Sequence, residues 1–337
     1  MLGPSNRLNV RINEGRVRQL ALTLGKLPLA DDFAAQMTPA MEVSDETAFR
    51  AYLWAAAICH STRGALTGHR GDRYYKGWDF LLRSFTHQAQ CDERGLGPEA
   101  VAIMTASRLR DILSSGSADA QLGLGDLPRR AEILRATARE LSESFDGCVS
   151  RLLNEADRRV GGESGAYAQL ARLTAFTDPL RKKSSAFLMT VHFSGRWPIV
   201  DHANVLPMID YHRMRLLMRT GCIEVTDERI ADRLRAEMPV SGHMEAAIRD
   251  AAMTVCTTIP RLAGMAMFDF DVLLWAHARS CCRRAPMCVS RTVESDSFYS
   301  YLAESPSKQC VFEAWCPGAT NAEVRSLWEP IVSTEYY

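Results

Sequence analysis

Four cysteines near the C-terminus place the strongest constraint on how this chain can fold. They form two pairs with the same spacing, Cys282-x5-Cys288 and Cys310-x5-Cys316. Four thiolates can bind one metal centre only if the fold brings both pairs together, and soft sulfur ligands select zinc or an iron–sulfur cluster over hard cations. Cys281 is an alternative to Cys282 as the first ligand. The same pattern also fits cysteines that are merely buried or reduced.

Length and charge narrow the classes of protein. With 337 residues, the chain predicts two lobes. It contains no run of about 18 uncharged apolar residues and no apolar N-terminal signal, so we expect a cytoplasmic monomer with no membrane partner. Its 40 basic and 40 acidic side chains give a formal net charge of zero. Because long duplex DNA is bound through an excess of cations, this balance favours a small anionic ligand or a narrow nucleic-acid footprint.

Apolar residues at helical spacing, together with capping residues, predict an all-α fold. The β-like runs, such as 197–200, are too short to predict a sheet. Predicted helices begin near Ser44, Pro98, Asp126, Cys148, Ser164, Asp178, Asp210, Thr226 and Ser241. Gly161-Gly162 interrupts the pattern. We therefore expect an N-terminal helical region at 1–162, a helical core at 163–280, a cysteine-rich segment at 281–317 and a C-terminal tail at 318–337.

Asp210 is the first candidate for a catalytic residue. It begins a predicted helix that ends at Gly221, and it starts the pattern Asp-x-His-x-x-Arg-x-x-x-Arg with His212, Arg215 and Arg219. An aspartate at this place is also the usual helix N-cap, so capping alone is the alternative. A fixed carboxylate in a dry pocket can stabilise the cationic sugar that forms when a base–sugar bond breaks.

This pattern resembles the segment that follows the catalytic aspartate of helix-hairpin-helix DNA glycosylases. The cysteine segment resembles the loop of the endonuclease III-like members, although residues 289–309 here separate cysteines that the family places close together. The resemblance implies a two-lobed, all-helical glycosylase-like fold. It also implies a C-terminal [4Fe-4S] cluster loop with Cys282, Cys288, Cys310 and Cys316 as ligands.

Arg181-Lys182-Lys183 lies in the first turn of a predicted helix, where cations oppose the helix dipole. A bound phosphate would explain them, and solvated side chains are the alternative. In the bifunctional glycosylases a lysine upstream of the aspartate attacks the sugar, and Lys183 is the nearest match by position, with Asp201 as a rival aspartate. The family's Leu-Pro-Gly-x-Gly hairpin is replaced by residues 177–180, so we expect water rather than lysine to be the nucleophile.

A second resemblance is to the queuosine salvage N-glycosylases. It rests on Asp178-Pro-Leu-Arg-Lys-Lys, on Asp210-Tyr211 and on Ser241-Gly-His-Met-Glu-Ala-Ala-Ile-Arg249. Those enzymes release a 7-deazaguanine base from a nucleoside or its 5′-phosphate, and they have arginine where His212 stands. This resemblance implies a compact substrate for the present chain.

The N-terminal half adds His60 and Trp78, which lie in segments rich in aromatic and polar residues that suit a base-binding pocket or a packed core. We predict an N-glycosidase that hydrolyses the base–sugar bond of a modified nucleobase in a nucleotide or nucleoside. Tyr211, His212, Arg215 and Arg181 are further substrate-binding candidates. A DNA glycosylase that excises a modified or damaged base is one alternative, and a non-catalytic iron–sulfur nucleic-acid-binding protein is the other.

Overall fold

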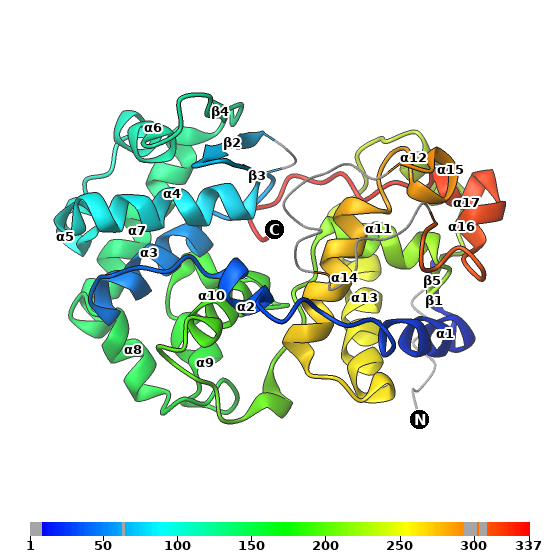
Figure 1. Ribbon diagram of the computed structural model, residues 1–337, viewed down its shortest axis with the longest axis horizontal. Helices are drawn as coiled ribbons and strands as arrows, with labels where there is room; N and C mark the ends of the chain where they lie inside the picture. The colour runs from blue at the N-terminus through cyan, green and yellow to red at the C-terminus, as the bar shows by residue number, and fades with distance from the viewer. Residues whose placement is uncertain (1–8, 63–64, 293–301, 303–308) are drawn as a thin grey trace. The chain divides into compact units, whose positions relative to one another are not determined.

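The computed structural model describes residues 9–62, 65–292, 302 and 309–337, and it is mostly helical (Figure 1). Helix makes up 56% and strand 7% of the structure. The predicted helical class is therefore confirmed in its broad form. The structure differs from the all-α prediction in two small antiparallel sheets. These sheets pair short strands from distant parts of the chain, and a local sequence pattern does not indicate such pairing.

The chain forms two compact units that cut across the predicted boundaries at 162 and 280. Unit 1 contains Met1–Phe33 and Leu206–Ser333, and unit 2 contains Ala34–Val205 and Thr334–Tyr337. The N-terminal segment thus belongs with the C-terminal half, and the last four residues belong with the N-terminal half. Most of the spacer 289–309 lies outside the described residues.

Unit 2 is built around helix α3 (Asp45–Ala57), which packs against α4 (Trp78–Cys91) and α10 (Lys182–Phe193). Ser44 caps α3 by accepting a hydrogen bond from the Thr47 N–H, as the sequence predicts. Nearly the whole of α3 is buried, so it forms the core of the unit. The other elements are α2 (Phe33–Met37), η1 (Glu93–Leu96), α5 (Pro98–Val101), α6 (Ala106–Ser114), α7 (Leu127–Phe145), α8 (Val149–Glu155), α9 (Ala166–Leu170), η2 (Thr174–Phe176) and η3 (His202–Asn204).

A three-stranded sheet of order β3-β2-β4 covers part of unit 2. Its strands are β2 (Leu66–Arg70), β3 (Arg73–Lys76) and β4 (Gln121–Leu122). Strands β2 and β3 form a hairpin in which Thr67 pairs with Lys76. Gly71 has φ +59° at the turn, a conformation that glycine adopts without steric cost.

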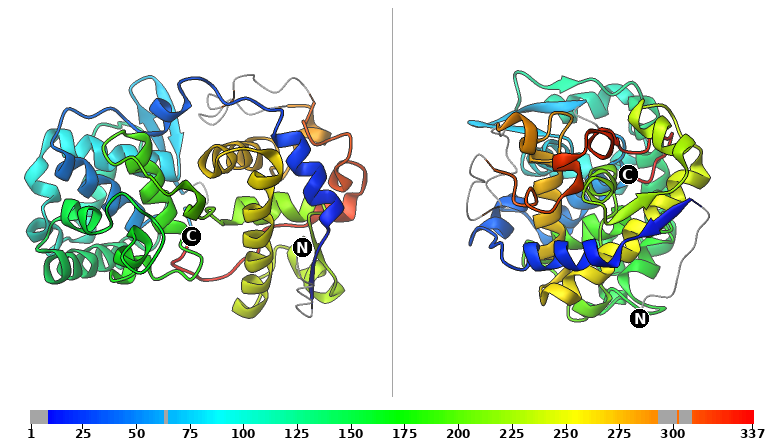
Figure 2. Two further views of the ribbon diagram at one scale, coloured as in Figure 1. Left: turned by 90° about the horizontal axis from the view of Figure 1, so that it is seen from below. Right: turned by 90° about the vertical axis from the view of Figure 1, so that its right-hand side faces the viewer.

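Unit 1 joins the N-terminal helix α1 (Glu14–Leu24) to the long helix α13 (Gly242–Ala263), and the two lie side by side in Figure 2. Strand β1 (Val10–Ile12) pairs antiparallel with β5 (Ile223–Val225). This pairing is a second contact between the N-terminal segment and the C-terminal half of the chain. Helix α11 (Tyr211–Arg219) packs against α14 (Met267–Ser280). The remaining helices are α12 (Glu228–Arg235), α15 (Met287–Ser290), α16 (Pro317–Thr320) and α17 (Ala322–Ser326).

Several predicted helices are shorter or divided. The helix predicted from Pro98 is interrupted between α5 and α6, and the one from Ser164 becomes α9 and η2. Helix α10 begins at Lys182, because Arg181 has φ +59°. The Asp178 carboxylate still accepts hydrogen bonds from the N–H groups of Leu180 and Lys182, so it supports the helix start from outside.

In the part of the chain that the structure describes, no single helix is long and apolar enough to cross a membrane. Helices α13 and α14 meet that criterion only as a pair bent by 115°.

Glu46, in the first turn of α3, ties that helix to the start of α8. Its carboxylate accepts hydrogen bonds from the N–H groups of Val149 (2.9 Å) and Ser150 (2.7 Å). We predict that Glu46→Ala lowers the free energy of unfolding by about 1–2 kcal/mol, because two helix-end N–H groups lose their acceptor. Urea unfolding measures this change. The matched control is Glu14→Ala, because Glu14 is an exposed residue in the first turn of α1. This control should change the free energy of unfolding by less than about 0.5 kcal/mol. Equal losses of stability in both variants would contradict the role given to Glu46.

Candidate functional site

Asp210 lies at the start of α11 and shares one arginine with a second carboxylate. Its Oδ1 accepts the Arg213 N–H at 2.9 Å, and its Oδ2 lies 3.3 Å from Arg213 Nη1. The other guanidinium nitrogen, Nη2, lies 3.1 Å from Oδ1 of Asp271 in α14. Asp210, Arg213 and Asp271 are 7%, 2% and 0% exposed as whole residues. Two carboxylates and one guanidinium carry a formal charge of −1, so the group has surplus negative charge.

Asp271 is the more deeply buried carboxylate of this group. It also accepts a hydrogen bond from the Met208 N–H at 3.0 Å. Burial raises the pKa of Asp271 to about 6, against the opposing effect of Arg213. At neutral pH the surplus charge is therefore present, and it is lost as Asp271 takes up a proton in mild acid.

The two other arginines of α11 hold the cysteine segment. Arg215 Nε donates to the Cys282 carbonyl at 2.8 Å and Nη2 donates to the Ala278 carbonyl at 2.9 Å. Arg219 Nη1 donates to the Arg283 carbonyl at 2.6 Å and Nε to the Leu327 carbonyl at 2.9 Å. The spacing of arginines after Asp210 thus has a structural role in this chain, which is to bind the backbone beside the predicted metal ligands.

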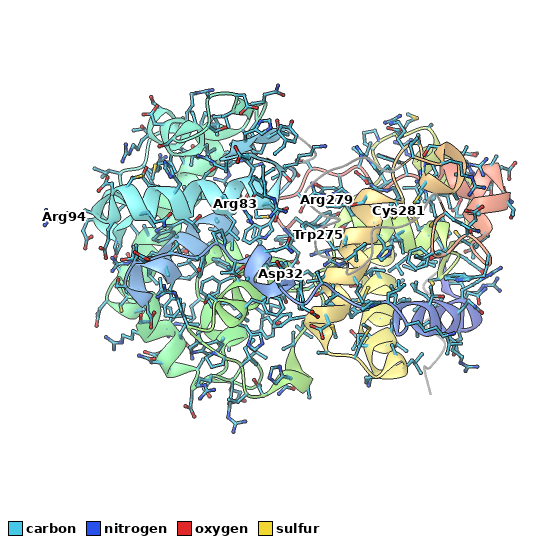
Figure 3. All side chains as sticks on the ribbon, viewed as in Figure 1. Asp32, Arg83, Arg94, Trp275, Arg279 and Cys281 are labelled. Atoms are coloured by element: carbon cyan, nitrogen blue, oxygen red, sulfur yellow. The ribbon has the colours of Figure 1, made fainter. Side chains whose placement is uncertain are left out.

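The cysteines of both pairs line one cavity. Cys281, Cys282, Cys288, Cys310 and Cys316 surround it together with Arg219 and Arg325. Figure 3 labels Cys281 just beyond the end of α14, the helix that also carries Trp275 and Arg279. The fold therefore places both cysteine segments at the wall of one cavity, but over the described residues it brings no cluster-binding set of cysteines close together.

The thiols are not arranged as ligands of a single ion. Over the described residues, no group of three or more His, Cys, Asp or Glu side chains could hold one metal ion. The space that they enclose is about 20 Å³, which is room for about one water molecule. Burial raises the pKa of Cys288, Cys310 and Cys316, the last to about 11, so these thiols are protonated at neutral pH in this state.

A larger cavity of about 330 Å³ adjoins the cysteines in unit 1. It shares Arg219, Pro286 and Arg325 with the thiol-lined cavity. Arg235, Arg284, Glu237 and Trp328 are also among the residues that line it. The guanidinium of Arg284 lies over the Trp328 ring at 5.0 Å. The chemistry of this lining suits an anionic ligand.

The lysines of α10 are turned into unit 2, toward the end of α3. Lys183 Nζ donates to the Ala57 carbonyl at 2.6 Å, and Lys182 Nζ donates to the Cys59 carbonyl at 3.1 Å. Arg130 of α7 donates to the carbonyls of Ile58 and His60. Because the last carbonyls of a helix have no partner within it, three buried cations satisfy the C-terminal end of α3. This explains cations at the start of α10 without a bound anion; the phosphate role of Lys182 and Lys183 remains a prediction.

Lys183 has an unusual protonation equilibrium. Burial, with the charge of Lys182 as the second cause, lowers the pKa of Lys183 to about 7. His60 is 3% exposed, and burial and the charge of Arg130 lower its pKa to about 2, so the imidazole is neutral. Its Nδ1 is buried without a hydrogen-bond partner among the described residues. Unit 2 therefore holds a neutral buried imidazole and a buried amine that is only partly protonated at neutral pH.

The other predicted residues fall in different surroundings. Asp201 accepts hydrogen bonds from the N–H groups of Val160 (2.8 Å) and Gly161 (3.0 Å), so its carboxylate closes a turn of unit 2. Trp78 begins α4 and is half-buried. The Tyr211 and His212 rings pack at 4.3 Å, and His212 Nδ1 lies 3.1 Å from Arg215 Nη2. Lys183 and Asp201 belong to unit 2 and Asp210 to unit 1.

Sequence reasoning missed Asp271 as the partner of Arg213. A signal was available, because Asp271 interrupts an apolar helix in the run Phe268-Asp-Phe-Asp-Val-Leu-Leu-Trp275. A charged residue on a buried helix face calls for a partner of opposite charge. Glu329, which forms an ion pair with Arg215, gives no such signal because it lies in an irregular segment.

Comparison with known proteins does not assign the chain to a family. The chain matches no protein-family model and has no significant match among curated protein sequences.

The low pKa of Lys183 predicts a specific pH dependence of stability. An unfolded lysine titrates near pH 10.4, so between about pH 7 and 10 the unfolded chain binds one more proton than the folded chain. The free energy of unfolding therefore rises with pH across this window by a contribution that Lys183→Met lacks. Urea unfolding at several pH values compares the two proteins. Lys26→Met, at an exposed position, should follow the wild type; parallel curves for wild type and Lys183→Met would contradict the prediction.

Proposed function

We propose that this protein is an N-glycosidase that hydrolyses the bond between a modified nucleobase and its sugar, with a nucleotide or nucleoside of the 7-deazaguanine class as substrate. The observation that carries the proposal is the buried group of Asp210, Arg213 and Asp271. The C–N bond of such a substrate breaks through a state in which the sugar gains positive charge. A preorganised negative charge with little access to water stabilises that state by several kcal/mol.

The two carboxylates have different parts in this proposal. Asp210 is 7% exposed and lies at the edge of the buried group, whereas Asp271 is fully buried. Asp210 is thus the member that can face a sugar and orient the attacking water. Asp271 forms an ion pair with one nitrogen of the Arg213 guanidinium. Because Arg213 is shared, it only partly neutralises the negative charge of Asp210. The proposal assigns Asp201 no chemical role, because both of its carboxylate oxygens accept hydrogen bonds from backbone N–H groups, whereas among the described residues Asp210 accepts one through Oδ1 alone.

We further propose that the cysteine-lined cavity binds a [4Fe-4S] cluster through Cys282, Cys288, Cys310 and Cys316. The donor set fits, because iron–sulfur clusters are held by four thiolates. A cluster spreads its ligands over several metal atoms, so its four thiolates need to surround a space and need not converge on one point. The enclosed space is small, so binding requires the two cysteine segments to move apart. When bound, the cluster would crosslink the end of α14 to residues 310–316.

A second candidate function is supported by the arginine-lined cavity. Its guanidinium groups and Trp328 lie beside the cysteines, and such a surface suits the phosphates of a nucleic acid as well as those of a nucleotide. This observation favours the DNA glycosylase alternative, with a modified or damaged base in DNA as substrate. Zero net charge over the whole chain still favours the compact substrate.

The glycosidase proposal is tested by release of free base. The purified protein is incubated with separate panels of modified nucleosides, nucleotides and DNA oligomers, and mass spectrometry detects the base. Asp210→Asn should reduce the rate roughly 10²-fold or more, because it removes the charge while asparagine remains a good N-cap. Borohydride should trap no covalent adduct, since water is the proposed nucleophile.

Asp201→Asn is the matched control and should keep its activity. Thermal unfolding of both variants checks that each remains folded. An inactive Asp201→Asn beside a fully active Asp210→Asn would show that the wrong aspartate was chosen. If both variants keep full activity, or if no panel releases a base, the glycosidase proposal fails.

The cluster is tested by metal and sulfide analysis of protein purified without oxygen. We expect brown protein that contains iron and sulfide, and loss of both in Cys288→Ser and Cys316→Ser. Cys91→Ser, an exposed free cysteine of unit 2, should keep the cluster. Comparing Cys281→Ser with Cys282→Ser identifies the first ligand. Colourless protein with one equivalent of zinc would overturn the proposal.

A further inference from the structure

Cys59 and Lys182 form a buried thiol–amine pair that the proposed function does not use. Lys182 Nζ lies 3.2 Å from Cys59 Sγ, and the side chains of the two residues are almost fully buried. The same Nζ donates to the Cys59 carbonyl at 3.1 Å. This second contact keeps the amine beside the sulfur, because the carbonyl lies two residues after the end of α3 and the lysine is the first residue of α10.

We propose that Cys59 and Lys182 are an oxidative modification site at which a hydroperoxide joins the sulfur to the nitrogen through one oxygen atom. The geometry selects this product over a direct sulfur–nitrogen bond. A direct bond would require two atoms that lie 3.2 Å apart to approach by a large part of that distance within a close-packed interior. One bridging oxygen fills the separation with little movement of either backbone.

The chemistry needs two equivalents of hydrogen peroxide. The first converts the Cys59 thiol to a sulfenic acid and leaves as water. In the second step the Lys182 ammonium releases one proton to solvent, and the resulting amine nitrogen forms a bond to the sulfenyl oxygen. One hydrogen from the sulfenic acid and one from the amine leave with the two oxygens of the second peroxide as two water molecules. The product is S–O–NH; sulfur and nitrogen are oxidised and both peroxides are reduced.

The surroundings of the other cysteines explain why this pair is selected. Cys91 is exposed on α4, and its thiol lies 3.6 Å from Nε2 of the His87 imidazole. Cys256 is fully buried, with Asp271 and Arg213 as its charged neighbours. Neither thiol is placed against a lysine amine as Cys59 is. An amine next to a thiol is required to capture the sulfenic acid before it is oxidised further.

The bridge would also change the neighbouring lysine. Lys182 loses its positive charge on bridging, and that charge is one cause of the low pKa of Lys183. The pKa of Lys183 should therefore rise, so that more of this amine is protonated at neutral pH. Oxidation of one pair is in this way coupled to the protonation of a second buried group.

The test uses the full-length protein treated with hydrogen peroxide, digested and analysed by tandem mass spectrometry. We expect a crosslinked pair of peptides that contain Cys59 and Lys182, with a mass about 14 Da above their sum, for one oxygen gained and two hydrogens lost. Dithiothreitol should reverse it. Lys182→Arg keeps the positive charge and the donors but removes the primary amine, so it should yield only sulfenic or sulfinic acid at Cys59. Cys91→Ser should form the crosslink as the wild type does.

Three results would overturn the proposal. One is a crosslink about 2 Da below the sum of the peptides, which is the mass of a direct sulfur–nitrogen bond. Another is wild-type protein in which Cys59 is oxidised only to acids or remains a thiol. The third is an unchanged yield of crosslink in Lys182→Arg. None of these outcomes depends on glycosidase activity, so the two proposals can fail separately.

Discussion

Buried cations that bind backbone carbonyl groups hold both candidate sites in shape. In unit 2, Lys182, Lys183 and Arg130 bind carbonyls at the end of α3 and in the three residues that follow it. In unit 1, Arg215 and Arg219 bind carbonyls of the cysteine segment. A carbonyl without a partner is costly inside a protein, and so is a cation without one. Each of these contacts satisfies both groups together, which explains why so many charged side chains are buried in a chain with no net charge.

The chemically interesting positions are those where this balance is incomplete. Arg213 faces two carboxylates, so the group of these three described side chains carries one more negative than positive charge. Lys183 is buried with Lys182 beside it, and among the described residues a carbonyl oxygen is its hydrogen-bond partner, so its positive charge is unfavourable and its pKa falls. Groups with pKa values moved toward neutral pH are frequent in active sites, because they can exchange protons under working conditions. Asp271 and Lys183 both have this property.

The cysteine cavity depends on the same contacts. Its walls come from the end of α14 and from residues 310–316, and α11 lies against α14 with two arginines directed at the backbone of the first wall. The residues that follow Asp210 therefore connect the candidate catalytic carboxylate to the candidate metal site. Asp210 caps the nine-residue helix α11, and arginines of the same helix bind the cysteine segment. A movement of the cysteine segment would therefore displace α11 and with it Asp210.

The sequence by itself determined the helical class and most of the helix starts. Helix caps and apolar periodicity act between residues that are close along the chain, so Ser44, Asp210 and Ser241 each begin a helix as predicted. Only the tertiary structure decided the partners of the charged residues. Lys182 looks like a phosphate ligand in its own helix, yet its ammonium binds a carbonyl more than a hundred residues away in the chain. Asp271 has no charged partner within its own helix, and it meets Arg213 because α14 packs against α11. Such pairings depend on which helix ends meet in space, and local sequence patterns carry no information about that.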